Sequence, residues 1–135
     1  MSQEFMMRKT KQTKFGKEGN CFSACLSCLL DMDLEDVPEF LDEDKWLKDL
    51  DAWLSKRWYM YVELDWDAKR TFMSWHGDCL VIGCGPSTRG LSHAVIGRMY
   101  VNRGRNEFKP VHDPHPDNTF LVELKQVGLI VPTWL

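Results

Sequence analysis

The sequence predicts a single α+β domain, spanning residues 1–135, in which helices come first and an antiparallel sheet follows. A chain of 135 residues with 44% hydrophobic residues has the size and apolar content of one compact domain. Helical spacing of apolar residues is confined to residues 21–58, and after residue 58 the period changes toward two, which is typical of strands. Since no long helical pattern separates the later strands, we expect them to pair antiparallel.

The N-terminal stretch is polar and basic with little periodicity, so we expect residues 1–11 to form a flexible arm and residues 12–19 to become ordered. The first helix is predicted over residues 21–32, CFSACLSCLLDM, which is apolar at nearly every position. This composition indicates a helix that is buried on most sides. Gly19 interrupts the chain before the helix, and Asn20 is a favourable N-cap.

Two further helical segments are predicted before the sheet. Residues 33–41 favour a short helical turn that is capped by Asp33 and limited by Pro38. Residues 42–58 predict a longer amphipathic helix with Asp42 as its cap. Its apolar residues recur at helical spacing: Trp46, Leu47, Leu50, Trp53, Leu54 and Trp58.

Six segments of the remaining chain have strand patterns, separated by Gly, Pro and Asn residues that favour turns. They are YMYVEL at 59–64, DCLVIG at 78–83, LSHAVIGRMYVN at 91–102, EFKPVHD at 107–113, TFLVEL at 119–124 and VGLIVP at 127–132.

Charge and hydropathy argue against nucleic-acid and membrane partners. The net charge is −3 and comes from mixed acidic and basic residues, so neither positive nor negative charge strongly predominates. The longest apolar runs, such as residues 28–30 and 128–132, are far shorter than the ~18 residues of a membrane-spanning helix. The first sixteen residues have no apolar block of the kind found in secretory signals. We therefore expect a soluble, cytoplasmic protein.

The chain has five cysteines, and their number and spacing predict free thiols. The count is odd, and three of the five fall within eight residues of the first helix, where a disulfide would add little. Cys21 lies in the first turn, where unpaired N–H groups and the helix dipole favour a thiolate. Cys25 and Cys28 lie one and two turns further on and are expected to pack in the core. On the helix evidence alone, Cys21 is equally well explained as a nucleophile or as a small buried residue.

A hairpin would bring a histidine and an aspartate together. His93 begins one predicted strand and Asp113 ends the next, before Pro114. If the turn lies in NRGRN and is centred on Arg103, His93 and Asp113 directly oppose each other, with Cβ atoms ~5 Å apart. Such a pair suits an imidazole that is oriented by a carboxylate, as a catalytic thiol requires.

Simpler explanations exist for each of these residues. His93 could be a half-buried strand histidine, and Asp113 could form a turn before proline. A one-residue slip would oppose His93 to His112 or Pro114 instead.

Three segments resemble the papain-like cysteine peptidase superfamily, and most of all the small bacterial and phage proteins similar to the double-glycine bacteriocin-processing peptidases. The segments are QTKFGKEGNCFSACLSCLL, GLSHAVIG and VHDPHP. The resemblance implies a papain-like fold, in which the buried N-terminal helix that carries Cys21 packs against a C-terminal antiparallel sheet that carries His93 and Asp113. It implies Cys21 as nucleophile, His93 as general base and acid, Asp113 as the orienting residue, and Gln12 as oxyanion donor.

The position of Gln12 departs from the family pattern, because it lies nine residues before Cys21, further than is usual. Asn20 could substitute for it, or the backbone N–H of Cys21 could contribute more.

These residues predict a cysteine hydrolase that cleaves an amide, peptide or isopeptide bond of a peptide or protein substrate through an acyl-enzyme, without a cofactor or metal. Two alternatives use the same fold: a transamidase or acyltransferase with the same triad, and a catalytically inert phage or effector protein that binds a partner.

The cysteines, histidines and tryptophans also allow a metal site and an aromatic cleft to be weighed. The helical cysteines together with Cys79, Cys84 and the HDPH segment could bind zinc, but three cysteines on one buried helix face give poor tetrahedral geometry. We therefore expect no metal, and we expect His112 and His115 to face solvent. Trp66 and Trp75 could line a cleft, although core packing is the better explanation.

Overall fold

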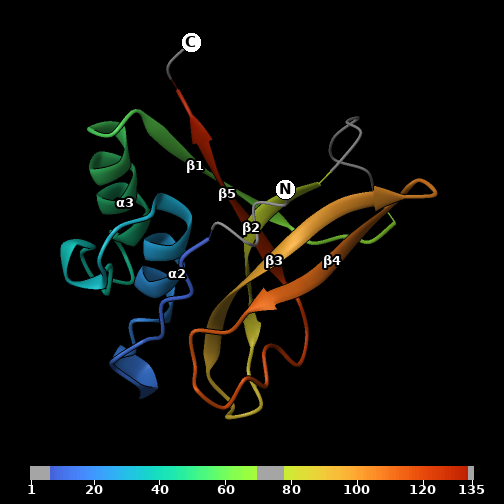
Figure 1. Ribbon diagram of the computed structural model, residues 1–135, viewed down its shortest axis with the longest axis horizontal. Coiled ribbons are helices and arrows are strands. Elements are labelled where there is room, and N and C mark those ends of the chain that lie inside the picture. Colours follow the sequence, from blue (N-terminus) through green and yellow to red (C-terminus); the bar gives the residue numbers. More distant parts are fainter. Residues whose placement is uncertain (1–6, 70–77, 134–135) are drawn as a thin grey trace.

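The structure, a computed structural model, describes residues 7–69 and 78–133. Its sheet has five strands, and every neighbouring pair is antiparallel, in the order β1-β5-β2-β3-β4 (Figure 1). The strands are β1 (Tyr59–Asp65), β2 (Asp78–Pro86), β3 (Ser92–Asn102), β4 (Arg105–His112) and β5 (Gln126–Pro132). The predicted α+β class, with helices first and an antiparallel sheet afterwards, is confirmed.

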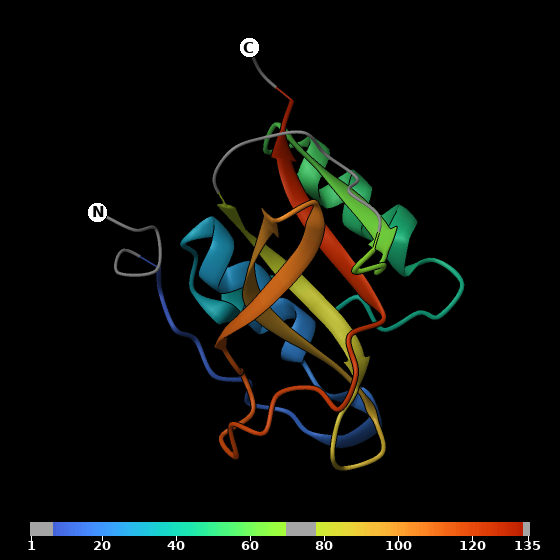
Figure 2. The same cartoon turned by 90° about the vertical axis from the view of Figure 1, so that its right-hand side faces the viewer.

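Two α-helices cover the same face of this sheet (Figures 1 and 2). Helix α2 (Cys21–Leu30) packs chiefly against β3, and α3 (Trp46–Ser55) packs against β1. Two 3-10 turns, η1 (Gly16–Glu18) and η2 (Leu34–Asp36), precede and follow α2.

Helix α2 is as deeply buried as its sequence predicts, because its polar residues find partners inside the protein. Ser23 donates to the carbonyl of Pro38 at 2.7 Å, and Ser27 donates to that of Met32 at 2.6 Å. Both serines are almost fully buried, and satisfied hydroxyls of this kind carry little desolvation cost.

Apolar side chains pack on both faces of the sheet. The larger cluster lies between the helices and the sheet and includes Leu26, Leu50, Leu54, Ile82 and Ile96. The smaller cluster is formed by Val81, Met99 and Val127, with Trp66 and Phe108 packed against it. Trp66 therefore contributes to packing, as predicted, whereas Trp75 lies outside the described residues.

Two predicted segments differ from the structure. Helix α3 is shorter than residues 42–58, because its N-cap is Lys45 and the Asp42 carboxylate instead accepts the N–H of Asp44 at 2.9 Å. The predicted strand at 119–124 is wrong, because Phe120 has a positive φ of 60° and the segment makes only isolated bonds to β2. One of these bonds joins Val122 N–H to the carbonyl of Pro86 at 2.8 Å.

The N-terminal arm makes contacts earlier than predicted. From Arg8 onwards it lies along α2, where the Arg8 guanidinium bonds the carboxylates of Asp31 and Asp33 at 3.2 and 2.6 Å. Asp33, the predicted cap of η2, therefore uses its side chain for Arg8 and makes no capping bond. The arm is thus part of the folded domain over residues 8–11.

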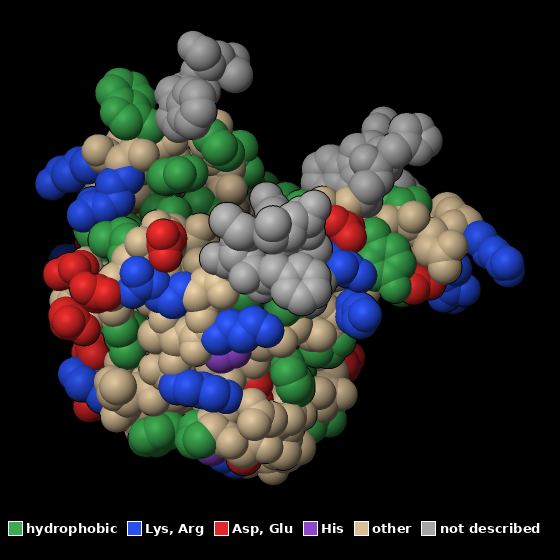
Figure 3. Space-filling model, in the orientation of Figure 1, with side chains coloured by type: hydrophobic (Ala, Val, Ile, Leu, Met, Phe, Trp, Pro, Cys, Tyr) green, Lys and Arg blue, Asp and Glu red, His purple; other side chains and the backbone are tan. Residues whose placement is uncertain are grey.

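Charged side chains of both signs are interspersed on the face shown in Figure 3. Within the described residues, no helix is long and apolar enough to cross a membrane.

Candidate active site

Three loops from distant parts of the chain meet at one end of the molecule, shown at the bottom of Figure 2. They are the arm before α2, the β2–β3 loop and the segment between β4 and β5. Backbone bonds join them: Gln12 N–H donates to Pro114 at 3.0 Å, and Val122 N–H donates to Pro86 at 2.8 Å. The predicted site residues Gln12, Cys21, His93 and Asp113 all belong to this end.

Cys21 is the first residue of α2 and is only partly buried. The first intrahelical bond runs from Ala24 N–H to the carbonyl of Asn20, so the N–H groups at the helix start have no intrahelical acceptor. All five cysteines are free, as predicted. Cys21 therefore combines an accessible thiol with the electropositive end of a helix.

The other four cysteines are in apolar surroundings that disfavour a thiolate. Burial raises the pKa of Cys25 well above its usual value and also raises the pKa of Cys28 and Cys79. Burial raises the pKa of Cys84 to about 12. These thiols are expected to stay protonated and unreactive near neutral pH.

His93 and Asp113 form a short, buried hydrogen bond, with His93 Nε2 2.6 Å from Asp113 Oδ1. Asp113 is 1% exposed, and its Oδ1 and Oδ2 also accept the N–H groups of His115 at 2.9 Å and Phe120 at 2.8 Å. Burial alone would raise the pKa of Asp113, but the bonds from His93 and from the two N–H groups outweigh it and lower this pKa. Asp113 is thus held as a carboxylate.

His93 also interacts with the Cys21 side chain. Burial favours the neutral ring, but hydrogen bonds with Asp113 and with the side chain of Cys21 raise the pKa of His93 to about 9. Because Nε2 bonds Asp113, Nδ1 is the ring nitrogen left for Cys21. The three predicted side chains therefore lie together, with His93 between the Asp113 carboxylate and the Cys21 side chain.

The register predicted for this pair is wrong, although the pair itself forms. The turn has two central residues, Arg103 and Gly104, with φ of 54° and 76°, and not a single central Arg103. This is the positive-φ turn that suits a tight hairpin. The ladder then shifts by one residue, because Gly97 pairs with Pro110 but Ile96 pairs with His112.

The shift is a β-bulge that restores the side-chain alternation at the site. Without the extra residue, Val111, Asp113 would be level with Ala94 and would point to the opposite face from His93. With it, Asp113 is level with Val95, which is on the same face as His93.

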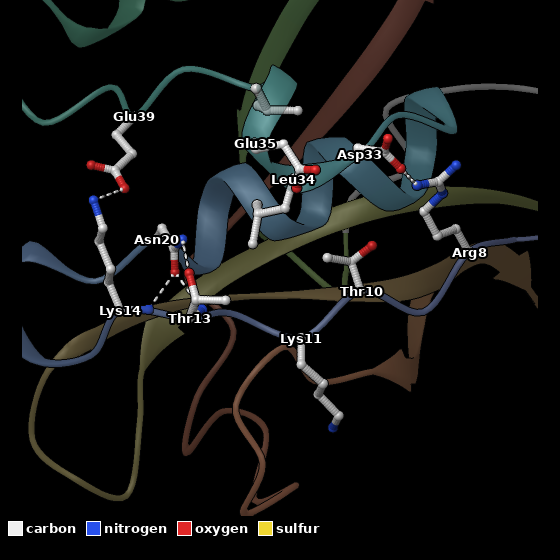
Figure 4. A pocket seen from close by; sticks show the side chains of 11 residues that line it. Arg8, Thr10, Lys11, Thr13, Lys14, Asn20, Asp33, Leu34, Glu35 and Glu39 are labelled. Carbon is white, nitrogen blue, oxygen red and sulfur yellow. Dashed lines mark hydrogen bonds and ion pairs between the residues drawn. The ribbon is translucent and has the colours of Figure 1, made fainter.

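Gln12 lies beside the start of α2, and Asn20 has a different role from the one predicted. Asn20 makes no capping bond to α2. Its Oδ1 accepts the N–H groups of Thr13 and Lys14 at 2.9 Å each, and its Nδ2 donates to Thr13 Oγ1 at 3.0 Å (Figure 4). Asn20 thus shapes the loop before Cys21.

Only one of the two side-chain N–H groups of Gln12 is used in its bond to Lys14. The residue is 7% exposed, and its Nε2 donates to the carbonyl of Lys14 at 2.8 Å. This nitrogen lies 3.5 Å from where a side-chain carbon of Gly19 would stand. The Gln12 amide is therefore adjacent to the backbone that leads into Cys21, and its second N–H is not used by this bond.

No sequence pattern predicted the contacts that hold the Asp113 loop. The Lys11 ammonium bonds the carbonyl of Asp113 at 2.9 Å and Asn118 Oδ1 at 2.7 Å. His112, predicted to face solvent, is 5% exposed, and its Nε2 donates to the carbonyl of Thr10 at 2.6 Å. The arm thus connects α2 to the segment that carries Asp113.

A polar hollow of about 870 Å³ lies on the other side of the arm, between residues 8–14 and the loop at 33–39 (Figure 4). It includes Asn20 but not Cys21, His93 or Asp113, and the Lys14–Glu39 ion pair of 2.7 Å crosses it. We therefore do not assign the chemistry to this hollow. Over residues 7–69 and 78–133, no three His, Cys, Asp or Glu side chains are grouped as metal ligands.

Comparisons of the chain with protein-family models, curated proteins and solved structures gave no match.

Proposed function

We propose that this protein is a papain-like cysteine hydrolase that cleaves an amide, peptide or isopeptide bond of a peptide or protein substrate. The observation that carries the proposal is the buried His93 ring, which bonds the Asp113 carboxylate through Nε2 at 2.6 Å and lies close enough to the Cys21 side chain for that side chain to raise its pKa. A thiol, an imidazole and an orienting carboxylate are the three groups that nucleophilic cysteine catalysis requires.

In the first half of the reaction, the Cys21 sulfur attacks the substrate carbonyl carbon and forms a C–S bond. Because the pKa of His93 is raised to about 9, the proton from Cys21 is already on the ring when the sulfur attacks, and the carbonyl oxygen becomes an oxyanion. The backbone N–H of Cys21 and the Gln12 amide are the proposed donors to this oxygen. When the intermediate collapses, the C–N bond breaks, His93 gives its proton to the leaving amine, and the acyl group stays on Cys21.

In the second half, water attacks the thioester carbonyl and gives a proton to His93. Collapse breaks the C–S bond, releases the carboxylic acid, and leaves the Cys21 sulfur as a thiolate beside the protonated His93. Asp113 remains a carboxylate throughout, because its three hydrogen bonds lower its pKa. It holds the ring so that Nδ1 faces the sulfur and stabilises the imidazolium.

The layout of the fold supports the papain-like assignment. The nucleophile begins a buried helix, and the histidine and aspartate come from the later antiparallel sheet and the end of β4. Five free thiols fit a reducing compartment, which supports a cytoplasmic location.

The proposal is tested by trapping the acyl-enzyme with p-nitrophenyl acetate. We expect a burst of p-nitrophenol close to one equivalent, with the acetyl group found on Cys21 by peptide mass spectrometry. Variants Cys21→Ala and His93→Ala should lose the burst, whereas Cys79→Ala, a matched thiol outside the site, should retain it. A burst that survives Cys21→Ala, or acetylation spread over several cysteines, would contradict the proposal.

A further inference from the structure

An exposed phenylalanine is joined to the proposed general base by two ring contacts. Phe15 is 52% exposed, and its ring meets His115 edge-on, with centroids 5.3 Å apart and planes at 77°. His115 in turn meets His93 edge-on, with centroids 6.2 Å apart and planes at 84°. A series of three rings therefore leads from the buried His93 to the exposed side chain of Phe15.

The loop that carries His115 is fixed by several bonds. The backbone N–H of His115 donates to Asp113 Oδ1 at 2.9 Å, and its Nδ1 accepts the N–H of Asp117 at 3.1 Å. Asp117 is bound by the Arg89 guanidinium and accepts the hydroxyl of Thr119 at 3.0 Å. The His115 ring is thus held in place before substrate binds, and the Asp117 carboxylate beside it is neutralised by Arg89.

The backbone around Phe15 is fixed as well. The carbonyl of Lys14 accepts Gln12 Nε2 at 2.8 Å, and Gly19 N–H donates to Gly16 at 3.0 Å. Phe15 belongs to neither apolar cluster of the described core. Packing of the domain therefore gives no reason for a large aromatic side chain at this position.

We propose that Phe15 and His115 form a subsite that receives a large apolar, preferably aromatic, side chain of the substrate beside the bond that is cleaved. This inference rests on the proposed function and specifies its substrate class. An aromatic ring of the substrate placed against Phe15 would extend the edge-to-face series of His93, His115 and Phe15. It would also bury part of the solvent-exposed surface of Phe15. A cationic side chain could also approach Phe15, but it would lie near the imidazolium of His93, which disfavours it.

The test compares three alkylating reagents that differ only beyond the reacting carbon: iodoacetamide, its N-phenethyl derivative and its N-(2-trimethylammonioethyl) derivative. In each case the Cys21 sulfur displaces iodide, and the rate at Cys21 is divided by the rate of the same reagent with glutathione. We expect the normalised rate of the phenethyl reagent to exceed that of iodoacetamide roughly tenfold, and the trimethylammonium reagent to show no such gain.

The variant Phe15→Ala should bring the phenethyl preference close to one, and Phe15→Leu should give an intermediate value. Leu47→Ala, which removes a 41% exposed side chain on α3, serves as the matched control and should keep the full preference. Equal normalised rates in the unmodified protein, a preference that survives Phe15→Ala, or a preference for the cationic reagent would overturn the subsite. A Cys21 that reacts with iodoacetamide no faster than glutathione does would instead contradict the proposed function, and the ratio between reagents would still decide the subsite.

Discussion

His93 is the residue on which the site depends, because it is 4% exposed and lies between a carboxylate and a thiol. An isolated imidazolium in such a place would lose its proton, since burial disfavours charge. The Asp113 carboxylate reverses this effect, and the same carboxylate stays ionised because two backbone N–H groups and His93 bond it. Each of the two groups thus needs the other to keep its charge inside the protein.

The raised pKa of His93 predicts how stability changes with pH. Since this pKa rises from 6.5 to about 9 on folding, the folded protein holds the proton more tightly than the unfolded chain. Its contribution to the free energy of unfolding is complete below pH 6.5 and is lost as the pH rises through about 9. Urea unfolding should therefore show a decline in stability across this interval, and Asp113→Asn should show a smaller decline. An equal decline in both proteins would contradict the ion pair.

Gln12 offers a second residue-scale prediction, because oxyanion stabilisation and thiol activation can be measured separately. Gln12→Ala should slow acetylation by p-nitrophenyl acetate by roughly 10²-fold, the usual effect of removing one oxyanion donor. Alkylation by iodoacetamide forms no oxyanion, so its rate at Cys21 should change by less than about threefold. A similar loss in both reactions would show that Gln12 supports the loop and does not bind the oxyanion.

At the scale of elements, the hairpin of β3 and β4 shows what a sequence pattern can and cannot provide. The His93–Asp113 pair was predicted because both residues lie at strand ends that a hairpin brings together. The turn was predicted within NRGRN, but its two-residue centre at Arg103 and Gly104 was not, and neither was the bulge at Val111, because these residues do not by themselves fix the length of a turn or mark an irregular ladder. The two-residue turn and the bulge each shift the register by one residue in the same direction, and a total shift of two keeps Asp113 on the face of His93, so the right pair followed from the wrong alignment.

The close approach of two segments near His93 gives a prediction for Gly85, which pairs with His93 in the sheet. A Cβ at Gly85 would overlap the backbone oxygen of Glu123. Gly85→Ala should therefore lower the free energy of unfolding by about 2–3 kcal/mol, as overpacking does, and should slow alkylation of Cys21.

Gly104→Ala is the matched control for Gly85→Ala. A Cβ at Gly104 meets nothing within 4 Å, and the only cost is a φ of 76°, which is about 1–2 kcal/mol for an L-residue. This variant should leave alkylation unchanged, because the turn is at the far end of the hairpin. A greater loss of stability in Gly104→Ala than in Gly85→Ala would contradict the packing described for Gly85.

The N-terminal arm gives a further prediction, because Lys11 holds the loop that starts at Asp113. Lys11→Met keeps most of the apolar stem but removes bonds of 2.9 and 2.7 Å to Asp113 and Asn118. We expect a loss of about 1 kcal/mol in stability and slower alkylation of Cys21. Lys14 lies in the same arm and forms an ion pair with Glu39. Because this ion pair does not involve the Asp113 loop, Lys14→Met should leave alkylation of Cys21 unchanged. If Lys11→Met and Lys14→Met change the alkylation rate of Cys21 equally, the proposed role of Lys11 in holding the Asp113 loop is contradicted.

For the whole molecule, the order of helices and strands could be predicted, whereas the arrangement in space could not. The change of period after residue 58 is a local property and was sufficient for the α+β class. The position of β5 between β1 and β2 and the bonding of the arm depend on contacts between distant residues, which leave no pattern in the chain. The segment at 119–124 has a strand's composition, but its geometry is set by Asp113, whose carboxylate accepts Phe120 N–H at 2.8 Å.

The same distinction applies to the candidate site. Cys21, His93 and Asp113 could be predicted from residue type, order and family likeness. Lys11 and His115 could not, because their roles come from the loops that the fold brings to one end of the molecule (Figure 2).

The central claim, that Cys21 is an activated thiol paired with His93, is tested most directly by the alkylation rate of each cysteine across pH, measured by mass spectrometry. Near neutral pH, Cys21 should react much faster than Cys79 and Cys84, whose pKa values are raised by burial. His93→Ala should remove this rapid reaction while the urea-unfolding transition remains cooperative. If Cys21 reacts no faster than Cys79 or Cys84, or if its rapid reaction survives His93→Ala, the account of the site is contradicted.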